Sequence, residues 1–265
     1  MIAVLPPETV WKNGTVLRSK AFRRLLILIV SLLAVVWVID SAIAARAERS
    51  FAQAVEESAE LEMSPGVYFG GTPYTQALIS GKIKQVSVSV SDVDTPNFGL
   101  ITTTTDAVDV QVGASQVFSG AIQGSRALLL TQTIGLDAVS VGQQLGIADL
   151  DISNPYDISP NGGTASEAQL RGTLKGQSKP VSVVADLRIE GPDFRLTPTK
   201  VLDRGDGTLS DEAIMDAMSW RIDTRLLPMR SQAGFVYVSG GTLYFQAQER
   251  NVTLRLRDFS PTNIG

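Results

Sequence analysis

The chain has 265 residues, 44% of them hydrophobic, and contains neither cysteine nor histidine. The lack of cysteine excludes disulfides and thiolate metal sites, and the lack of histidine removes the commonest general base and metal ligand. The formal net charge of −4 gives no sign of the basic surface that nucleic-acid binding normally requires. The composition therefore argues against nucleic-acid binding and weakens the case for an enzyme.

A long apolar run near the N-terminus predicts a transmembrane helix. The run is uninterrupted from Leu25 to Ile39, and its extension to Ala45 gives 21 residues. A helix of that length measures about 31 Å, which is enough to cross the hydrocarbon core of a bilayer. Five basic residues precede the run against one acid, so the positive-inside rule keeps the N-terminus in the cytoplasm; they are Lys12, Arg18, Lys20, Arg23 and Arg24.

These features divide the chain into a basic cytoplasmic tail (1–24), a single-pass anchor in the cell membrane (25–45) and one extracytoplasmic domain (46–265). The alternative is a cleaved signal peptide and a secreted body, because Ala42 to Ala44 matches a signal-peptidase site. The anchor is favoured because the sequence from Ser41 to Glu62 continues as a good helix former, whereas cleavage sites usually lie in extended segments.

Several helices are expected in the body. The helix that follows the anchor is amphipathic and ends before Pro65. A second, about two turns long, is expected over Thr72 to Ser80, with Thr72 as its cap, Pro73 in the first position and Gly81 at its left-handed end. A third is expected over residues 136–147. A fourth is predicted from the Ser210 cap to just before Pro228, with an apolar stripe every four residues: Ile214, Met218, Ile222 and Leu226.

Most other segments alternate between apolar and polar residues, as strands with one buried face do. From Ile83 onward the period is two, the segment from Pro180 to Gly191 alternates likewise, and the segment from Gly234 to Gln248 is a hairpin around Gly240 and Gly241. The order of helices and strands lacks βαβ repetition. We therefore predict an α+β fold, rich in strands, in which helices cover the apolar face of an antiparallel sheet.

Motifs that would indicate catalysis or metal binding are incomplete. The segment around Ser115 lacks the closing glycine of a nucleophile elbow, and no histidine exists to activate the serine. If Gly207 were the central glycine of a calcium loop, the first and third positions would be Leu202 and Arg204, which are not ligands. We predict no catalytic residue, no metal site and no cofactor.

The succession of motifs resembles the actinobacterial LmeA-like phospholipid-binding proteins. The stretch GTPYTQALISGKIKQVSVSV matches the family's pattern at Gly71, Pro73, Tyr74, Thr75, Gln76, Leu78, Gly81, Val86 and Val88. Other parts agree in order: an Ala/Glu-rich helix after the membrane segment, NPYDISPNGGTASEAQLRGTL followed by PVSVVADLRI, and LLPMRSQAGFVYVSGGTLYF. The resemblance covers about Asp40 to Leu256. It departs from the pattern at Tyr74, where phenylalanine is expected and where a buried hydroxyl requires a polar partner.

The resemblance implies a protein of the cell envelope (periplasm) of mycolic-acid bacteria. It further implies a tubular body, formed by a long curved sheet and plugged by short helices, that holds phospholipid in a hydrophobic cavity. In some relatives the role is in building mannosylated phosphatidylinositol glycolipids such as lipomannan. A phospholipid, including the phosphatidylinositol type, is therefore the expected ligand, bound or transferred without catalysis.

The alternating faces supply candidate cavity-lining residues: Val86, Val88, Val90, Val181, Val183, Leu187, Val236, Val238, Leu243 and Phe245. The alternative is that these faces meet the helices in a closed core. Lys82 and Lys84 are candidate head-group contacts at the mouth of the tube, unless they are simply the solvated start of a strand. The alternative function is a noncatalytic envelope scaffold that binds an unidentified protein partner through an exposed strand edge.

Overall fold

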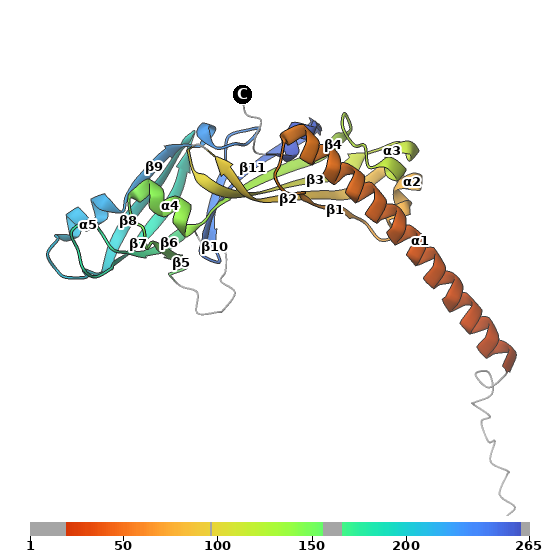
Figure 1. Cartoon of the computed structure of the whole chain (residues 1–265), viewed down its shortest axis with the longest axis horizontal. Helices are drawn as coiled ribbons and strands as arrows, with labels where there is room; N and C mark the ends of the chain where they lie inside the picture. Colours follow the sequence, from red (N-terminus) through yellow and green to blue (C-terminus); the bar gives the residue numbers. More distant parts are fainter. Residues whose placement is uncertain (1–19, 96, 156–165, 261–265) are drawn as a thin grey trace, which may run out of the picture.

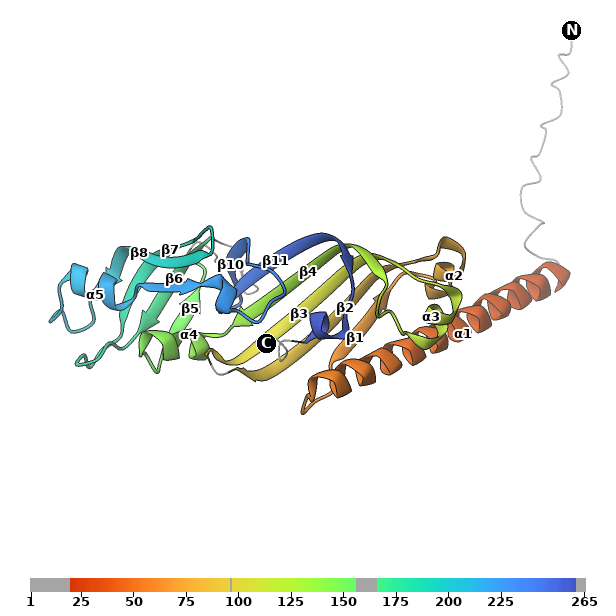
Figure 2. The same ribbon diagram turned by 90° about the horizontal axis from the view of Figure 1, so that it is seen from above.

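The computed structural model describes residues 20–95, 97–155 and 166–260. It shows an elongated body in which two antiparallel sheets lie end to end, with one long helix that runs along the first sheet and projects beyond it (Figures 1 and 2). The predicted α+β, strand-rich architecture is confirmed, although two sheets share the strands that the sequence assigned to one. Lys12, Arg18 and residues 156–165 of the NPYDISPNGGTASEAQLRGTL segment lie outside the described residues.

The first sheet has six strands and the second has five. In the first, the strand order is β1-β2-β3-β4-β11-β10, with β1 at Gly66–Gly70, β2 at Lys82–Thr95, β3 at Gly99–Gln111, β4 at Arg126–Leu136, β10 at Phe235–Ser239 and β11 at Thr242–Thr253. In the second, the order is β5-β6-β7-β8-β9, with β5 at Asp151–Ser153, β6 at Glu167–Gly172, β7 at Val181–Glu190, β8 at Asp193–Asp203 and β9 at Trp220–Asp223.

The helices are short apart from the first. They are α1 (Lys20–Ala59), α2 (Ala77–Ser80), α3 (Ala114–Ser119), α4 (Ala138–Leu145) and α5 (Asp211–Ala217), with 3-10 turns η2 (Tyr74–Gln76), η3 (Thr224–Leu226) and η4 (Leu256–Phe259). The predicted helix over 136–147 is confirmed as α4, with Asp137 as its cap. The predicted hairpin around Gly240 and Gly241 is confirmed as β10 and β11.

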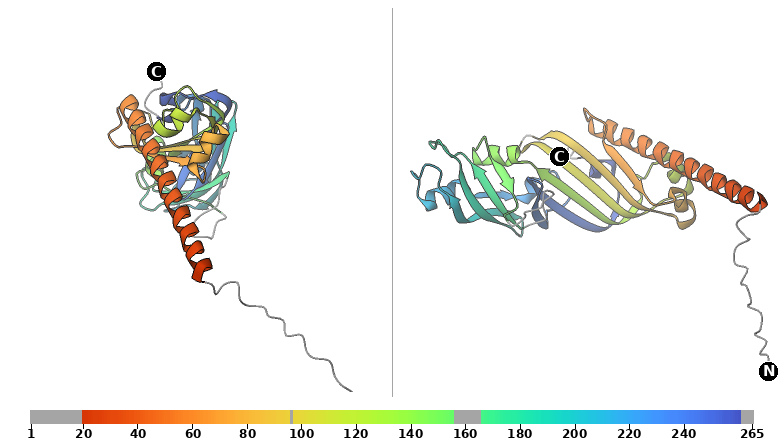
Figure 3. Two further views of the ribbon diagram at one scale, coloured as in Figure 1. Left: turned by 90° about the vertical axis from the view of Figure 1, so that its right-hand side faces the viewer. Right: turned by 90° about the horizontal axis from the view of Figure 1, so that it is seen from below.

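Helix α1 has two halves with opposite environments. From Phe22 to Ile39 its side chains are exposed, and this half is long and apolar enough to cross a membrane. From Asp40 onward it packs on the first sheet, with Ala47, Phe51 and Val55 buried. Figure 3 shows the exposed half projecting from one end of the molecule, which we call the α1 end of the body.

The packed half of α1 and the turn η4 cover the inner face of the first sheet. The Phe51 ring of α1 lies 5.1 Å from the Phe259 ring of η4, edge to face, and 5.8 Å from the Phe69 ring of β1. Edge-to-face pairs of this kind add about 0.5–1.5 kcal/mol to the stabilisation from apolar burial. The cover is therefore apolar, and it brings the packed half of α1 and the C-terminal turn η4 together on the same sheet.

A buried polar network holds η4 in place. The hydroxyl of Thr105 and the amide of Gln132 both donate to the carbonyl oxygen of Asp258, at 3.2 and 2.7 Å. Arg230 pairs its guanidinium with the Asp258 carboxylate at 2.8 Å and donates its backbone N–H to Gln132 at 2.7 Å. Asp258 is only 3% exposed. Since removal of one partner would leave a buried charge unpaired, the network is a strong constraint on the position of η4.

Aromatic contacts join the two sheets. The Phe194 ring of β8 lies 4.8 Å from the Phe245 ring of β11 and 5.5 Å from the Trp220 ring of β9, both edge to face. Strand β10 also contacts β6 and β7. Buried apolar side chains therefore form one continuous core through both sheets.

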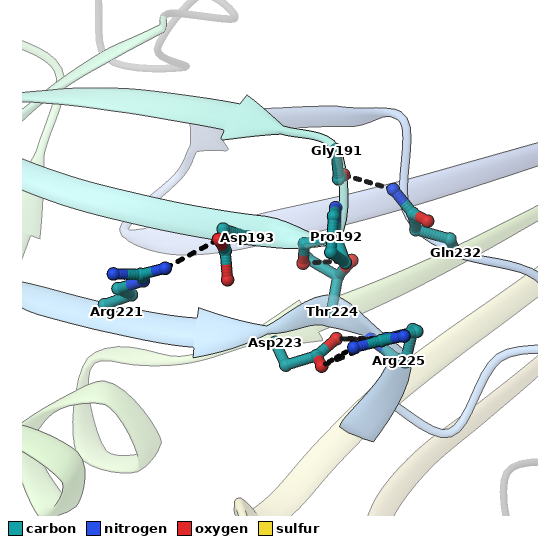
Figure 4. A network of polar contacts seen from close by, with 8 residues as sticks. All are labelled: Gly191, Pro192, Asp193, Arg221, Asp223, Thr224, Arg225 and Gln232. Atoms are coloured by element: carbon teal, nitrogen blue, oxygen red, sulfur yellow. Dashed lines mark hydrogen bonds and ion pairs between the residues drawn. The ribbon is translucent and has the colours of Figure 1, made fainter.

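Polar contacts at the end of the second sheet hold β9 and η3 against β8 (Figure 4). Arg221 contacts Asp193 at 2.6 Å, Thr224 donates its hydroxyl to the Pro192 carbonyl at 2.9 Å, and Gln232 donates to the Gly191 carbonyl. Hydrogen bonds from Arg225 hold the pKa of Asp223 at about 2. These contacts hold the strand and the turn that follow α5 in place.

The long helix predicted from Ser210 to Pro228 is wrong beyond Ala217. Its start is correct, because the Ser210 hydroxyl caps α5 by accepting from the Ala213 N–H at 3.2 Å. Residues from Trp220 instead form β9, which pairs with β8 from Asp193 to Leu196. Strand pairing and the ring contact of Trp220 with Phe194 outweigh the helical spacing of the apolar residues, and Leu226 is left exposed.

Candidate functional site

The central feature of the α1 end is a buried carboxylate on α1. Asp40 is 7% exposed and directly follows the exposed apolar half of the helix. Its carboxylate accepts the backbone N–H of Tyr74 at 2.9 Å, the N–H of Thr75 at 2.7 Å and the hydroxyl of Thr75 at 2.6 Å. Charged hydrogen bonds to a buried group are among the stronger ones in proteins. Asp40 therefore ties α1 to the loop that leads into α2.

This arrangement corrects the predicted start of the short helix. Pro73 precedes η2 in an extended conformation (φ −71°, ψ 149°), and no side chain of the loop itself caps the turn. Thr72 is therefore not the cap, because the distant Asp40 carboxylate accepts the first free N–H groups instead. The predicted end is confirmed: Gly81 has φ 65° and donates its N–H to Ala77 at 2.9 Å.

Tyr74 connects the same loop to α3. Its ring is 4% exposed and stacks on Phe69 at 6.0 Å, and its hydroxyl donates to the Val117 carbonyl at 2.8 Å. The hydroxyl thus has the polar partner that the sequence required of it. Burial, with further contributions from the negative charges of Glu48 and Asp40, raises the pKa of Tyr74 far above its ordinary value.

A pocket of about 240 Å³ opens beside α2. Its wall includes Tyr74, Ala77 and both predicted head-group residues, Lys82 and Lys84. Lys82 approaches Asp109 at 3.9 Å, an exposed pair of the kind that contributes little to stability. Within the described residues Lys84 has no ion-pair partner, so its ammonium group is available to an anion in the pocket.

Strand β2 continues from this pocket into the core. Its register with β3 has no shift between Lys82 and Val90. The alternation of burial breaks between Ile83 and Val86, which are both buried although they lie three residues apart, and Asp109 of β3 has a positive φ of 52° at this level. This part of β2, from Lys82 to Val90, which we call the β2 row, begins with two exposed cations and continues along the strand with three buried valines. A lipid has the same order, with a charged head group at one end and apolar acyl chains beyond it.

The predicted cavity residues lie in two groups. The valines of the β2 row belong to one buried cluster with Phe51 of α1 and Phe259 of η4. The other residues belong to the strands near the junction of the sheets: Val181, Val183, Leu187, Val236, Val238, Leu243 and Phe245. All are buried except Val236, which is partly exposed. The first group is therefore packed against protein side chains, as expected if these valines belong to a closed core and do not line an open lipid cavity. Val90 also lines a pocket of about 380 Å³ at the far end of β2, together with Leu61 and Met63.

Sequence reasoning missed two sets of residues that position this site. Asp40 carried a usable signal, because a lone acid at the end of an apolar run is costly in a membrane and calls for a buried partner. The second set left no recognisable signal in the sequence, because its hydrogen bonds join positions that are far apart. It consists of Thr105, Gln132, Arg230 and Asp258. Among the described residues, no three acidic side chains are placed to hold a metal ion.

Comparison with known proteins identifies one match. A sequence model described as LmeA-like phospholipid-binding matches residues 38–248, which is most of the chain and includes Asp40, the second sheet and the first sheet up to the middle of β11. No curated protein and no solved structure shows significant similarity to the chain.

Replacement of Asp40 by alanine is expected to loosen the loop without unfolding the sheets. Three buried or half-buried donors lose their acceptor, at about 1–3 kcal/mol for each one left unpaired. Amide hydrogen exchange of the full-length protein in detergent should accelerate at Tyr74 and Thr75. Glu57→Ala, which removes an exposed acid from the same helix, is the control. Unchanged exchange at both amides would contradict the role of Asp40.

The raised pKa of Tyr74 predicts a loss of stability at alkaline pH. The contribution is fully present below the unfolded pKa of about 10 and is lost as the pH rises above it, because the unfolded chain then ionises while the native chain does not. The free energy of unfolding should fall less steeply with pH in Tyr74→Phe than in the unmodified protein. Denaturant titrations at about pH 9 and about pH 11 measure this difference. Equal slopes would show that Tyr74 ionises freely in the folded protein.

Proposed function

The chain belongs to the LmeA-like phospholipid-binding family, and on that premise we propose that it is a membrane-anchored carrier whose body lies outside the cytoplasm. The body binds phospholipid, with the head group at Lys82 and Lys84 and the acyl chains along the apolar core, and releases it chemically unchanged. The observation that carries this proposal is the β2 row, which begins at a lysine-lined pocket and leads into the core.

The exposed half of α1 supports the anchor. Its apolar part, Leu25 to Ile39, comprises 15 residues, or about 22 Å of helix, and the long side chains of Arg23 and Arg24 can reach from its start to the head groups. The body is already in contact with α1 at Asp40, so the bilayer segment ends near Ile39, within the predicted span of 25–45. Arg23 and Arg24 lie at the opposite end of this segment, and by the positive-inside rule they support a cytoplasmic location for that end.

The position of Asp40 argues against the cleaved signal peptide. Cleavage after Ala44 would remove Asp40 and leave the N–H groups of Tyr74 and Thr75 without an acceptor. The predicted cleavage site also lies inside the continuous helix α1. A retained anchor keeps these hydrogen bonds, and it keeps the lysine-lined pocket next to the membrane.

The two lysines favour an anionic head group, and a phosphatidylinositol-type lipid is the candidate within that class. Acyl chains need an apolar surface, because each exposed CH₂ costs about 0.8 kcal/mol in water. The valines of the β2 row supply such a surface, at present covered by α1 and η4. We infer that lipid entry displaces part of this cover. Support of glycolipid maturation in the cell envelope is the cellular role we propose for such a carrier.

The scaffold alternative is less well supported. It requires an exposed strand edge, and in the first sheet the β1 edge is shielded by α1. Glu48 of α1 accepts the backbone N–H of Phe69 in β1 at 2.9 Å, which occupies a donor that strand addition would use. The β1 edge is therefore poorly suited to add a partner strand.

Neutralising both lysines should weaken binding of anionic phospholipid. Removal of two cations near a lipid head group costs about 1 kcal/mol each, which corresponds to roughly a thirtyfold loss of affinity for Lys82→Gln/Lys84→Gln. Titration of the full-length protein in detergent with a fluorescent anionic phospholipid measures it. The matched control is Lys175→Gln/Lys200→Gln, which removes two exposed lysines of the second sheet and its loops.

Equal loss of affinity in both double variants would contradict a local head-group site. Lipid recovered from the unmodified protein should have the mass of the lipid supplied. Time-dependent deacylation or sugar addition by the pure protein would instead show that it is an enzyme.

A further inference from the structure

We propose that exposed apolar side chains on α2 and α3 form a second membrane contact, which docks the α1 end of the body onto the bilayer that α1 spans. This inference rests on the anchor in the proposed function and goes beyond it. The residues are Leu78, Ile79 and Phe118, which we call the apolar tip. The partner is the interfacial layer of the membrane, at the level of the lipid head groups and the first methylenes.

The apolar tip is unusually exposed for its composition. Ile79 is 91% exposed, Phe118 48% and Leu78 38%, and they lie on two short helices that contact each other. Single exposed apolar residues are common on protein surfaces. Clustered ones mark a contact with another apolar phase.

Asp40 fixes the height of the apolar tip relative to the membrane. The exposed apolar half of α1 ends at Ile39, and the next residue is hydrogen-bonded to Tyr74 and Thr75. Helix α2 begins two residues after Thr75. If the bilayer boundary lies near Ile39, the start of α2 lies close to that boundary.

Helix α3 is tied to the same level. The Tyr74 hydroxyl donates to the carbonyl of Val117, the residue before Phe118. Figures 1 and 3 show α2 and α3 beside α1 at the point where α1 leaves the body. The apolar tip therefore adjoins the apolar surface of the proposed anchor.

Nearby charges favour the membrane over a protein as the partner. Lys82 and Lys84 follow α2 directly and are exposed. An apolar cluster next to basic residues is typical of segments that lie in a membrane interface, with the apolar side chains among the acyl chains and the cations at the phosphates. Such a contact would restrict the tilt and rotation that a single anchor allows, and would turn the lysine-lined pocket toward the head groups.

The lack of cysteine permits a direct test in the full-length protein. Ile79→Cys, labelled with an environment-sensitive NBD fluorophore, is reconstituted in vesicles of phosphatidylcholine and phosphatidylglycerol. Nitroxide groups on lipid head groups or upper acyl carbons act as quenchers. Two other positions are labelled separately: Val139→Cys, on α4 at the far end of the first sheet and 62% exposed, and Val30→Cys, within the exposed half of α1 and 56% exposed.

We expect the label at position 79 to shift to shorter wavelength and to be quenched by the nitroxide lipids, whereas the label at position 139 shows neither change. Quenching at position 30 without any at position 79 would overturn the apolar tip while leaving the anchor intact. A wavelength shift at position 79 without quenching would mean that protein covers the tip, and would also overturn the proposal. Lack of quenching at position 30 would instead refute the anchor, and with it the inference.

Discussion

The Asp40 carboxylate is the interaction on which the arrangement of the molecule depends. It lies at the point where α1 changes from an exposed apolar helix to one packed on the sheet, and it is hydrogen-bonded to the loop before α2. A carboxylate buried without such donors would be strongly unfavourable. The same contacts therefore stabilise the acid, define the start of α2 and hold the lysine-lined pocket beside the proposed anchor.

The β2 row links this junction to the interior. Two cations at its start and three valines beyond them follow the order of a head group and its acyl chains. In the described structure α1 and η4 cover the valines, so the interior is a packed core in this state. The cover is uneven, because α1 contacts the body along several turns whereas η4 is a single turn held by Asp258 and its partners. If lipid displaces part of the cover, η4 is the smaller part to move.

Local patterns in the sequence were sufficient for many elements, and the failures share one physical cause. Gly81 ends α2 and the hairpin at Gly240 forms as predicted, because both depend on neighbouring residues alone. The Thr72 cap and the helix beyond Ala217 failed because distant partners, Asp40 and β8, compete with the local preference. Alternation predicted which valines are buried, but not whether helices or lipid cover them, since both are apolar.

The central claim, that acyl chains occupy the interior along the β2 row, is tested most directly by photo-crosslinking. An anionic phospholipid with a diazirine in its acyl chain is reconstituted with the full-length protein, and the adducts are mapped by peptide mass spectrometry. Bound lipid should give adducts on the segment that contains Val86, Val88 and Val90, in addition to those that bulk lipid gives on α1. Adducts confined to the exposed half of α1 and to the apolar tip would show that the protein contacts lipid only through the segments that adjoin the membrane, and not in its interior.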